Sequence, residues 1–89
     1  MFYVVICTDK PGHLEVRQAN RADHVAYLKS TNVTQAGPFL DANGDMCGSL
    51  VILDVADRAE AEAWAAADPY KLADLFTDVR IEAWNRVIG

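Results

Sequence analysis

The sequence predicts a single α+β domain in which two helices cover one face of a four-stranded antiparallel sheet. Four segments rich in β-branched and aromatic residues have the character of strands: 2–8, 33–40, 47–55 and 77–87. The segment 13–32 repeats apolar residues at helical intervals, and 58–67 is an alanine-rich segment that follows a capping residue. An Asn43-Gly44 turn joins the second and third strands as a hairpin. This order over residues 1–89, β-α-β-β-α-β, is that of the ferredoxin-like fold.

The first strand is apolar from Phe2 through Cys7. A strand that is apolar on both sides is normally covered on both, so we expect it to lie in the centre of the sheet. The helix that follows carries Val16 on its outer side, and His24 lies at the edge of its inner face. The residues predicted to share that inner face are Leu14, Arg17, Arg21, Val25 and Leu28.

The second strand contains Gly37-Pro38. Because proline donates no hydrogen bond to a sheet ladder, this strand is expected at an edge or with a bulge. In the third strand, Ser49, Val51 and Leu53 share one face.

The second helix begins after Asp57, which forms a capping-box pattern with Glu60. Four of its residues are expected to allow close packing: Ala59, Ala63, Ala66 and Ala67. A short helical or irregular segment, 70–76, then leads to the last strand, where Trp84 shares a face with charged residues. With both helices on one side, the other sheet face stays bare although it is largely apolar, so we expect a homodimer packed sheet to sheet.

Composition excludes several classes of function. The formal net charge is −5 and the basic residues are scattered, which argues against nucleic-acid binding. Cys7 and Cys47 are far apart and form no CxxC pair, so we expect neither a disulfide framework nor a cysteine metal site. No apolar run is long enough for a membrane span and no leader pattern is visible. We therefore expect a cytoplasmic protein with no metal site and no membrane partner.

Two arginines and a histidine share the inner side of the first helix. Arg17, Arg21 and His24 follow each other at intervals of four and three residues. Buried charge is costly unless it is paired or hydrated, so one interpretation is a cleft where His24 titrates and an arginine binds an anion. The other is that the arginines extend to water and His24 is an ordinary boundary residue.

Three further segments have both a structural and a functional interpretation. Asp68 before proline is a good helix cap, but its carboxylate could also orient a histidine ring. Ser49 lies among apolar neighbours without a nucleophile elbow, so a serine hydrolase is not indicated. Gly37 and Pro38 either form a bulge or shape a pocket wall.

Taken together, these segments resemble the YciI-like (YCII-related) family. The features that carry the resemblance occur in family order across nearly the whole chain: Arg17 and Arg21 followed by His24 and Leu28, Ala36-Gly37-Pro38-Phe39, Gly48-Ser49, Glu62-Ala63-Trp64, and Ala67-Asp68-Pro69-Tyr70. The glycine-rich hairpin is shorter here than in the family pattern, which could alter one pocket wall.

The resemblance implies a ferredoxin-like dimer with a catalytic pair, His24 and Asp68, and no cofactor. The substrate-binding residues that it implies are Arg17, Arg21, Ser49, Gly37, Pro38 and Tyr70. One branch of the family is similar in role to a dehydrochlorinase of chlorinated hydroxyhydroquinones. The leading hypothesis is therefore general acid–base catalysis of elimination or isomerisation on a small aromatic or lactone compound.

Two other hypotheses stay open. One is a non-catalytic dimer with a ligand-binding or regulatory role. In that case His24 only forms a hydrogen bond to the small-molecule ligand. The other is a cofactor-free monooxygenase, which rests on analogy of fold alone.

Overall fold

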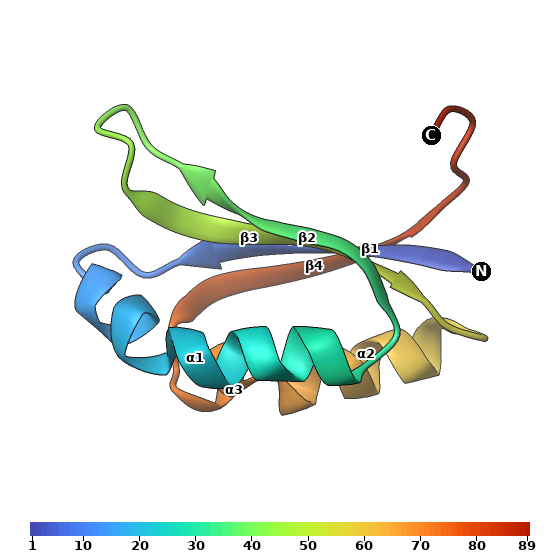
Figure 1. Cartoon of the computed structure of the whole chain (residues 1–89), viewed down its shortest axis with the longest axis horizontal. Coiled ribbons are helices and arrows are strands. Elements are labelled where there is room, and N and C mark those ends of the chain that lie inside the picture. The colour runs from blue at the N-terminus through green and yellow to red at the C-terminus, as the bar shows by residue number, and fades with distance from the viewer.

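The computed structural model describes residues 1–89 as one four-stranded sheet with three helices on one of its faces (Figure 1). The elements are β1 (Phe2–Asp9), α1 (Leu14–Ser30), β2 (Val33–Leu40), β3 (Met46–Asp54), α2 (Arg58–Ala67), α3 (Pro69–Leu72) and β4 (Phe76–Trp84). The predicted α+β architecture is confirmed. The boundaries of β2 and α2 match the prediction, whereas the last strand begins one residue earlier than expected and ends at Trp84.

The sheet is antiparallel throughout, with the strand order β2-β3-β1-β4. Val5 of β1 lies opposite Val51 of β3 on one side and Ile81 of β4 on the other, which confirms the central position of the first strand. β2 is an edge strand, one of the two arrangements expected for a strand with Pro38, and its register with β3 shifts between Val33 and Gln35 and between Phe39 and Leu40.

The hydrophobic core lies between the sheet and the helices. Val5, Leu53 and Leu75 are almost fully buried there. From α2 the buried residues are Ala61, Trp64 and Ala65, so the expectation that Ala59, Ala63, Ala66 and Ala67 pack closely is wrong. The physical reason is that Trp64, the largest side chain of the helix, determines which side faces the sheet, and Ala61 and Ala65 share its side.

On α1 the expected outer position of Val16 is also wrong, because Val16 packs against the core. His24, expected at the edge of the inner face, is buried, whereas Arg21 is exposed. The helix is therefore rotated about its axis relative to the predicted orientation. Tyr27 and Leu28 join Val16 against the core.

Local hydrogen bonds define the turns and the start of α2. Gly44 adopts a positive φ of 81° in the β2–β3 turn, where Asp41 Oδ1 accepts the backbone N–H of Asn43 and of Asp45. At α2, Asp57 accepts the N–H of Glu60 as predicted. The Glu60 carboxylate, however, reaches the N–H of Ala56, one residue before the cap.

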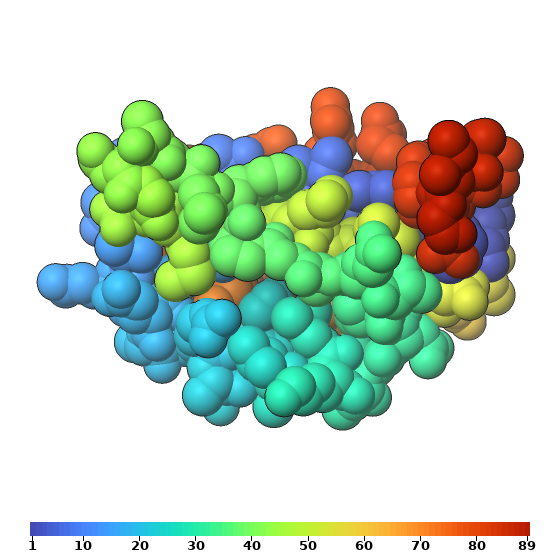
Figure 2. Space-filling model, turned by 45° about the horizontal axis from the view of Figure 1, so that its top comes forward, coloured from blue at the N-terminus to red at the C-terminus, as the bar shows by residue number.

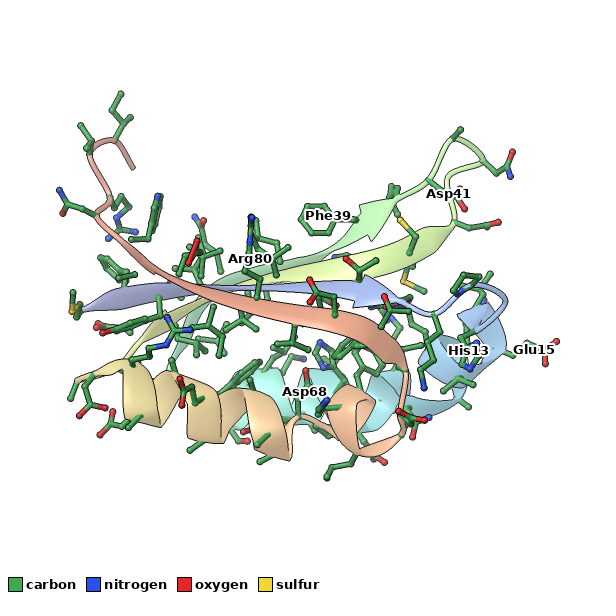
Figure 3. All side chains as sticks on the ribbon, turned by 180° about the vertical axis from the view of Figure 1, so that it is seen from behind. His13, Glu15, Phe39, Asp41, Asp68 and Arg80 are labelled. Carbon is green, nitrogen blue, oxygen red and sulfur yellow. The ribbon has the colours of Figure 1, made fainter.

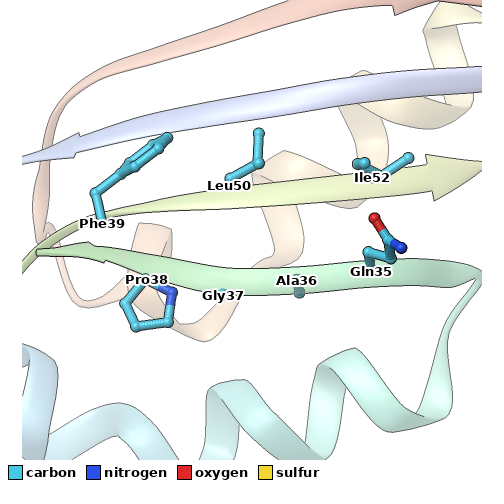
Figure 4. A pocket seen from close by; sticks show the side chains of 7 residues that line it. All are labelled: Gln35, Ala36, Gly37, Pro38, Phe39, Leu50 and Ile52. Carbon is cyan, nitrogen blue, oxygen red and sulfur yellow. The ribbon is translucent and has the colours of Figure 1, made fainter. Parts of the chain in front are cut away.

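The sheet face away from the helices is open. Phe39, Leu50 and Ile52 lie on it and line a shallow depression of about 460 Å³ with neighbouring residues of β2 (Figure 4). Phe39 and Arg80 project from this side, whereas Asp68 lies between sheet and helices (Figure 3). None of the helices is both long and apolar enough to cross a membrane.

Candidate functional site

A small cavity of about 170 Å³ lies between α1 and the β2–β3 side of the sheet. In the space-filling view a hollow opens between the blue-to-cyan helix and the green hairpin, and orange atoms from the region of α3 are visible inside it (Figure 2). The cavity brings together seven of the predicted site residues: Arg17, Arg21, His24, Gly37, Pro38, Ser49 and Tyr70. Sequence reasoning did not single out its further wall residues, which include Met46 and Val51.

His24 and Asp68 form a buried hydrogen-bonded pair. The distance from His24 Nδ1 to Asp68 Oδ1 is 2.7 Å, and both side chains are less than a tenth exposed. Asp68 does not line the cavity, so it contacts His24 on the side of the ring that faces away from the cavity. A carboxylate can only accept here, so Nδ1 carries the proton of this bond.

The other ring nitrogen of His24 is available to the cavity. Nε2 makes no hydrogen bond within the chain. Every buried side-chain nitrogen or oxygen has a hydrogen-bond partner, so Nε2 is not fully buried. Nε2 therefore retains access to solvent through the cavity that His24 lines. With the proton on Nδ1, Nε2 presents a lone pair and can accept a proton from a bound molecule.

Asp68 performs its capping role with the same oxygen that holds His24. Asp68 Oδ1 accepts the backbone N–H of Tyr70 at 3.0 Å, at the start of α3. Pro69 occupies the first position of this helix, where its missing N–H costs nothing. The structural and the functional interpretation of Asp68 are thus compatible.

The Tyr70 ring fixes the plane of His24. The two rings stack with centroids 3.8 Å apart and an interplanar angle of 15°. The Arg17 guanidinium carbon lies 4.5 Å from the centroid of the Tyr70 ring. Burial raises the pKa of the Tyr70 hydroxyl, and the positive charge of Arg17 only partly offsets this.

Arg17 is buried and paired rather than extended to water. Its Nε and Nη2 donate to the two carboxylate oxygens of Asp9, at 2.7 and 2.8 Å, and Nη2 also donates to Ser49 Oγ at 2.8 Å. Burial by itself lowers the pKa of Arg17, but the hydrogen bond and charge of Asp9 outweigh it and leave that pKa raised. Arg17 is therefore a permanent cation whose charge Asp9 neutralises.

Sequence reasoning missed Asp9. A signal was present, because Asp9 continues the alternation of Tyr3, Val5 and Cys7, the residues of β1 that face the helices. A carboxylate on that side is a natural partner for an arginine on the inner side of the next helix.

Arg21 differs from Arg17 in both exposure and pairing. It lines the same cavity but is exposed, and its side chain takes part in none of the chain's ion pairs or side-chain hydrogen bonds. The two arginines that the sequence placed together are thus separated by the structure into one that is buried and neutralised and one that is free.

Comparison with known proteins identifies the family. The model of the YCII-related domain matches residues 1–85. The chain is 33% identical to Protein YciI of Escherichia coli and 35% identical to an uncharacterized protein of Haemophilus influenzae, in each case over 98% of this chain and 99% of the relative. The chain belongs to the YCII-related family, as its motifs predicted.

Two solved structures are informative for comparison. The 5-chloro-2-hydroxyhydroquinone dehydrochlorinase TftG of Burkholderia phenoliruptrix, in complex with 2,5-dihydroxybenzoquinone, superposes with a TM-score of 0.90 at 33% identity, over 96% of this chain and 94% of that one. An antibiotic biosynthesis monooxygenase superposes with a TM-score of 0.59 at 17% identity, over 99% of this chain and all of the other. The second likeness concerns the fold alone.

Proposed function

We propose that this protein is a cofactor-independent enzyme that uses His24 and Asp68 for general acid–base catalysis. Its reaction is the elimination, as in dehydrochlorination, or the isomerisation of a small aromatic or lactone compound. The observation that carries the proposal is the buried 2.7 Å contact between His24 Nδ1 and Asp68 Oδ1, with Nε2 left to the cavity. The likeness to TftG, a dehydrochlorinase, supports the choice of reaction.

Each side chain has a defined part in this proposal. His24 Nε2 accepts a proton from the bound substrate, and Asp68 holds the Nδ1 proton and stabilises the imidazolium that forms. In an elimination, chloride leaves with the electron pair of its bond while the proton passes to His24, so no oxidant is consumed. Ser49 Oγ accepts from Arg17, which leaves its own proton free to donate to a substrate oxygen.

The test is chloride release from 5-chloro-2-hydroxyhydroquinone by the purified protein and by two variants, His24→Gln and Asp68→Asn. We expect turnover by the parent protein and a loss of about 10²- to 10⁴-fold in His24→Gln, because a positioned proton-transfer group contributes about that much. His13→Gln is the matched control, because the His13 ring bonds only the carbonyl of Pro11 and lies outside the cavity.

Equal chloride release by the parent and by His24→Gln would contradict the proposal. If the protein binds the compound but releases no chloride, and His24→Gln only weakens binding, the site belongs to a ligand-binding or regulatory protein instead.

We also propose that two chains pair through the open face of the sheet. Phe39 is 42% exposed and Trp84 38% exposed on this face, beside the half-buried side chains of Val4, Ile6 and Leu50. An apolar sheet face of this kind is typical of a surface that meets a partner. Light scattering should give a dimer that Trp84→Glu weakens. Leu72→Glu, which changes an exposed leucine on the helical side, should leave the mass unchanged.

A further inference from the structure

We infer that the cavity selects single-ring anions and that Arg21, not Arg17, is the residue that binds their negatively charged group. This inference rests on the proposed function, because it concerns the substrate class of the same cavity. It depends on three observations: the pairing of the two arginines, the position of Asp68 and the volume of the cavity.

The ion pair with Asp9 leaves Arg17 with no uncompensated charge for a ligand. Both carboxylate oxygens of Asp9 are bonded to Nε and Nη2 of Arg17, and Nη2 also bonds Ser49. Nη1 alone has no partner in the chain, so Arg17 can still donate to a ligand oxygen, but its charge is already balanced by Asp9. A substrate anion would have to compete with a buried carboxylate that is already in place. Arg17 is therefore a positioning residue, which holds the Ser49 hydroxyl and lies against Tyr70.

Arg21 retains its full charge at the cavity. It follows Arg17 by one helical turn, lines the same space and forms no ion pair within the chain. It is also exposed in the free protein, so it is not desolvated until a ligand covers it. A free guanidinium is well suited to an oxyanion or carboxylate, because its planar donors can meet two oxygens at once.

The local charges favour an anion although the chain as a whole carries −5. Asp9 cancels the charge of Arg17. Asp68 does not line the cavity, and the His24 ring to which it is hydrogen-bonded lies between its carboxylate and the cavity. Arg21 then supplies the one uncompensated charge among the ionisable residues that line the cavity.

The volume limits the ligand to one ring. A cavity of about 150 Å³ accommodates benzene, and this cavity measures about 170 Å³. Walls from Val25, Leu28, Pro38 and Val51 give it apolar sides for a planar ring. A second fused ring would exceed this volume and would have to lie outside the cavity.

The experiment compares benzoate with benzamide, which have the same shape but differ by one charge at pH 7. Each is titrated into the ¹⁵N-labelled protein, and Kd is obtained from the amide shifts of residues at the cavity. The variants are Arg21→Gln, Arg21→Lys and the control Lys29→Gln, which removes the same charge from an exposed position in the last turn of α1, outside the cavity.

We expect the parent protein and Lys29→Gln to bind benzoate about five- to tenfold more tightly than benzamide, as one charge-assisted contact allows. Arg21→Gln should abolish this preference and leave benzamide binding unchanged, and Arg21→Lys should retain part of it. A preference that persists in Arg21→Gln overturns the inference, as does failure of both probes to shift the cavity amides. Because the readout is binding, charge selection without turnover would refute the proposed reaction and leave this inference intact.

Discussion

Arg17 and Asp9 form a two-point ion pair that is buried on both sides, with side chains only 2% and 6% exposed. Breaking a buried pair on one side leaves an uncompensated charge, which typically costs about 3–5 kcal/mol. Asp9→Asn should therefore lower the free energy of unfolding by about that amount, as measured by urea titration. Asp23→Asn, at an exposed site on α1, the helix that carries Arg17, is the control and should change the free energy of unfolding by less than about 0.5 kcal/mol. Similar values for the two variants would show that the pair contributes nothing to stability.

The single oxygen of Asp68 that serves both His24 and Tyr70 makes a second prediction possible. Asparagine keeps a carbonyl oxygen at this position, so Asp68→Asn can retain both hydrogen bonds while it removes the charge. Asp68→Ala loses the cap and leaves the His24 N–H without an acceptor, which should cost about 2–4 kcal/mol. Thermal unfolding should rank the parent and Asp68→Asn close together and Asp68→Ala well below. The reverse order of the two variants would contradict the shared-oxygen geometry.

Cys7 should make the protein less stable in alkali. Its burial, together with the nearby charge of Asp68, raises the pKa of the thiol from 9.0 to about 12. The unfolded chain therefore loses this proton first, so the contribution of Cys7 is complete below pH 9 and is lost as the pH rises from 9 towards 12. Over that range it adds a slope of about −1.4 kcal/mol per pH unit to the free energy of unfolding.

Denaturant titrations between pH 8 and 10.5 on the parent protein and on Cys7→Ala measure this slope. The variant is less stable at every pH because it leaves a cavity, but its stability should fall less steeply above pH 9. Parallel curves would exclude Cys7 as the titrating group.

Gly48 should tolerate no side chain. A Cβ at this position would lie 2.5 Å from the carbonyl oxygen of Cys7 and 3.2 Å from Phe39 Cδ2, so the neighbouring strand would have to move. Gly48→Ala should therefore destabilise the protein by about 1–3 kcal/mol in urea titration. Gly37→Ala is the matched strand control, because its Cβ would meet no atom within 4 Å. An effect no larger than that of the control would mean that the strands adapt without cost.

The sequence predicted the fold well where the residue patterns were unambiguous. The apolar first strand and Pro38 fixed a central and an edge position, because both depend on local chemistry. The alanine-rich helix could not be oriented in this way, because its alanines contribute alike on every side and the decisive contact is that of Trp64 with the far end of α1. Trp64 Nε1 donates to Thr31 Oγ1, a contact between residues 33 positions apart.

The site shows the same division. The types of its residues and their helical spacing were visible in the sequence, and the family motifs joined His24 to Asp68 across 44 positions. The separate roles of Arg17 and Arg21 were not, because they follow from which one meets Asp9. That contact depends on how α1 is rotated over the sheet, which spacing alone leaves undetermined.

The position of the β2–β3 hairpin has a consequence for the shape of the cavity. Met46, just after the turn, forms part of the cavity wall, whereas His24, Asp68 and Tyr70 are held by α1 and α3. A longer or shorter hairpin would therefore change the wall that Met46 forms without moving the hydrogen-bonded pair of His24 and Asp68. Changes confined to one exposed turn would thus alter the shape of the cavity, while the positions of His24 and Asp68 stay the same.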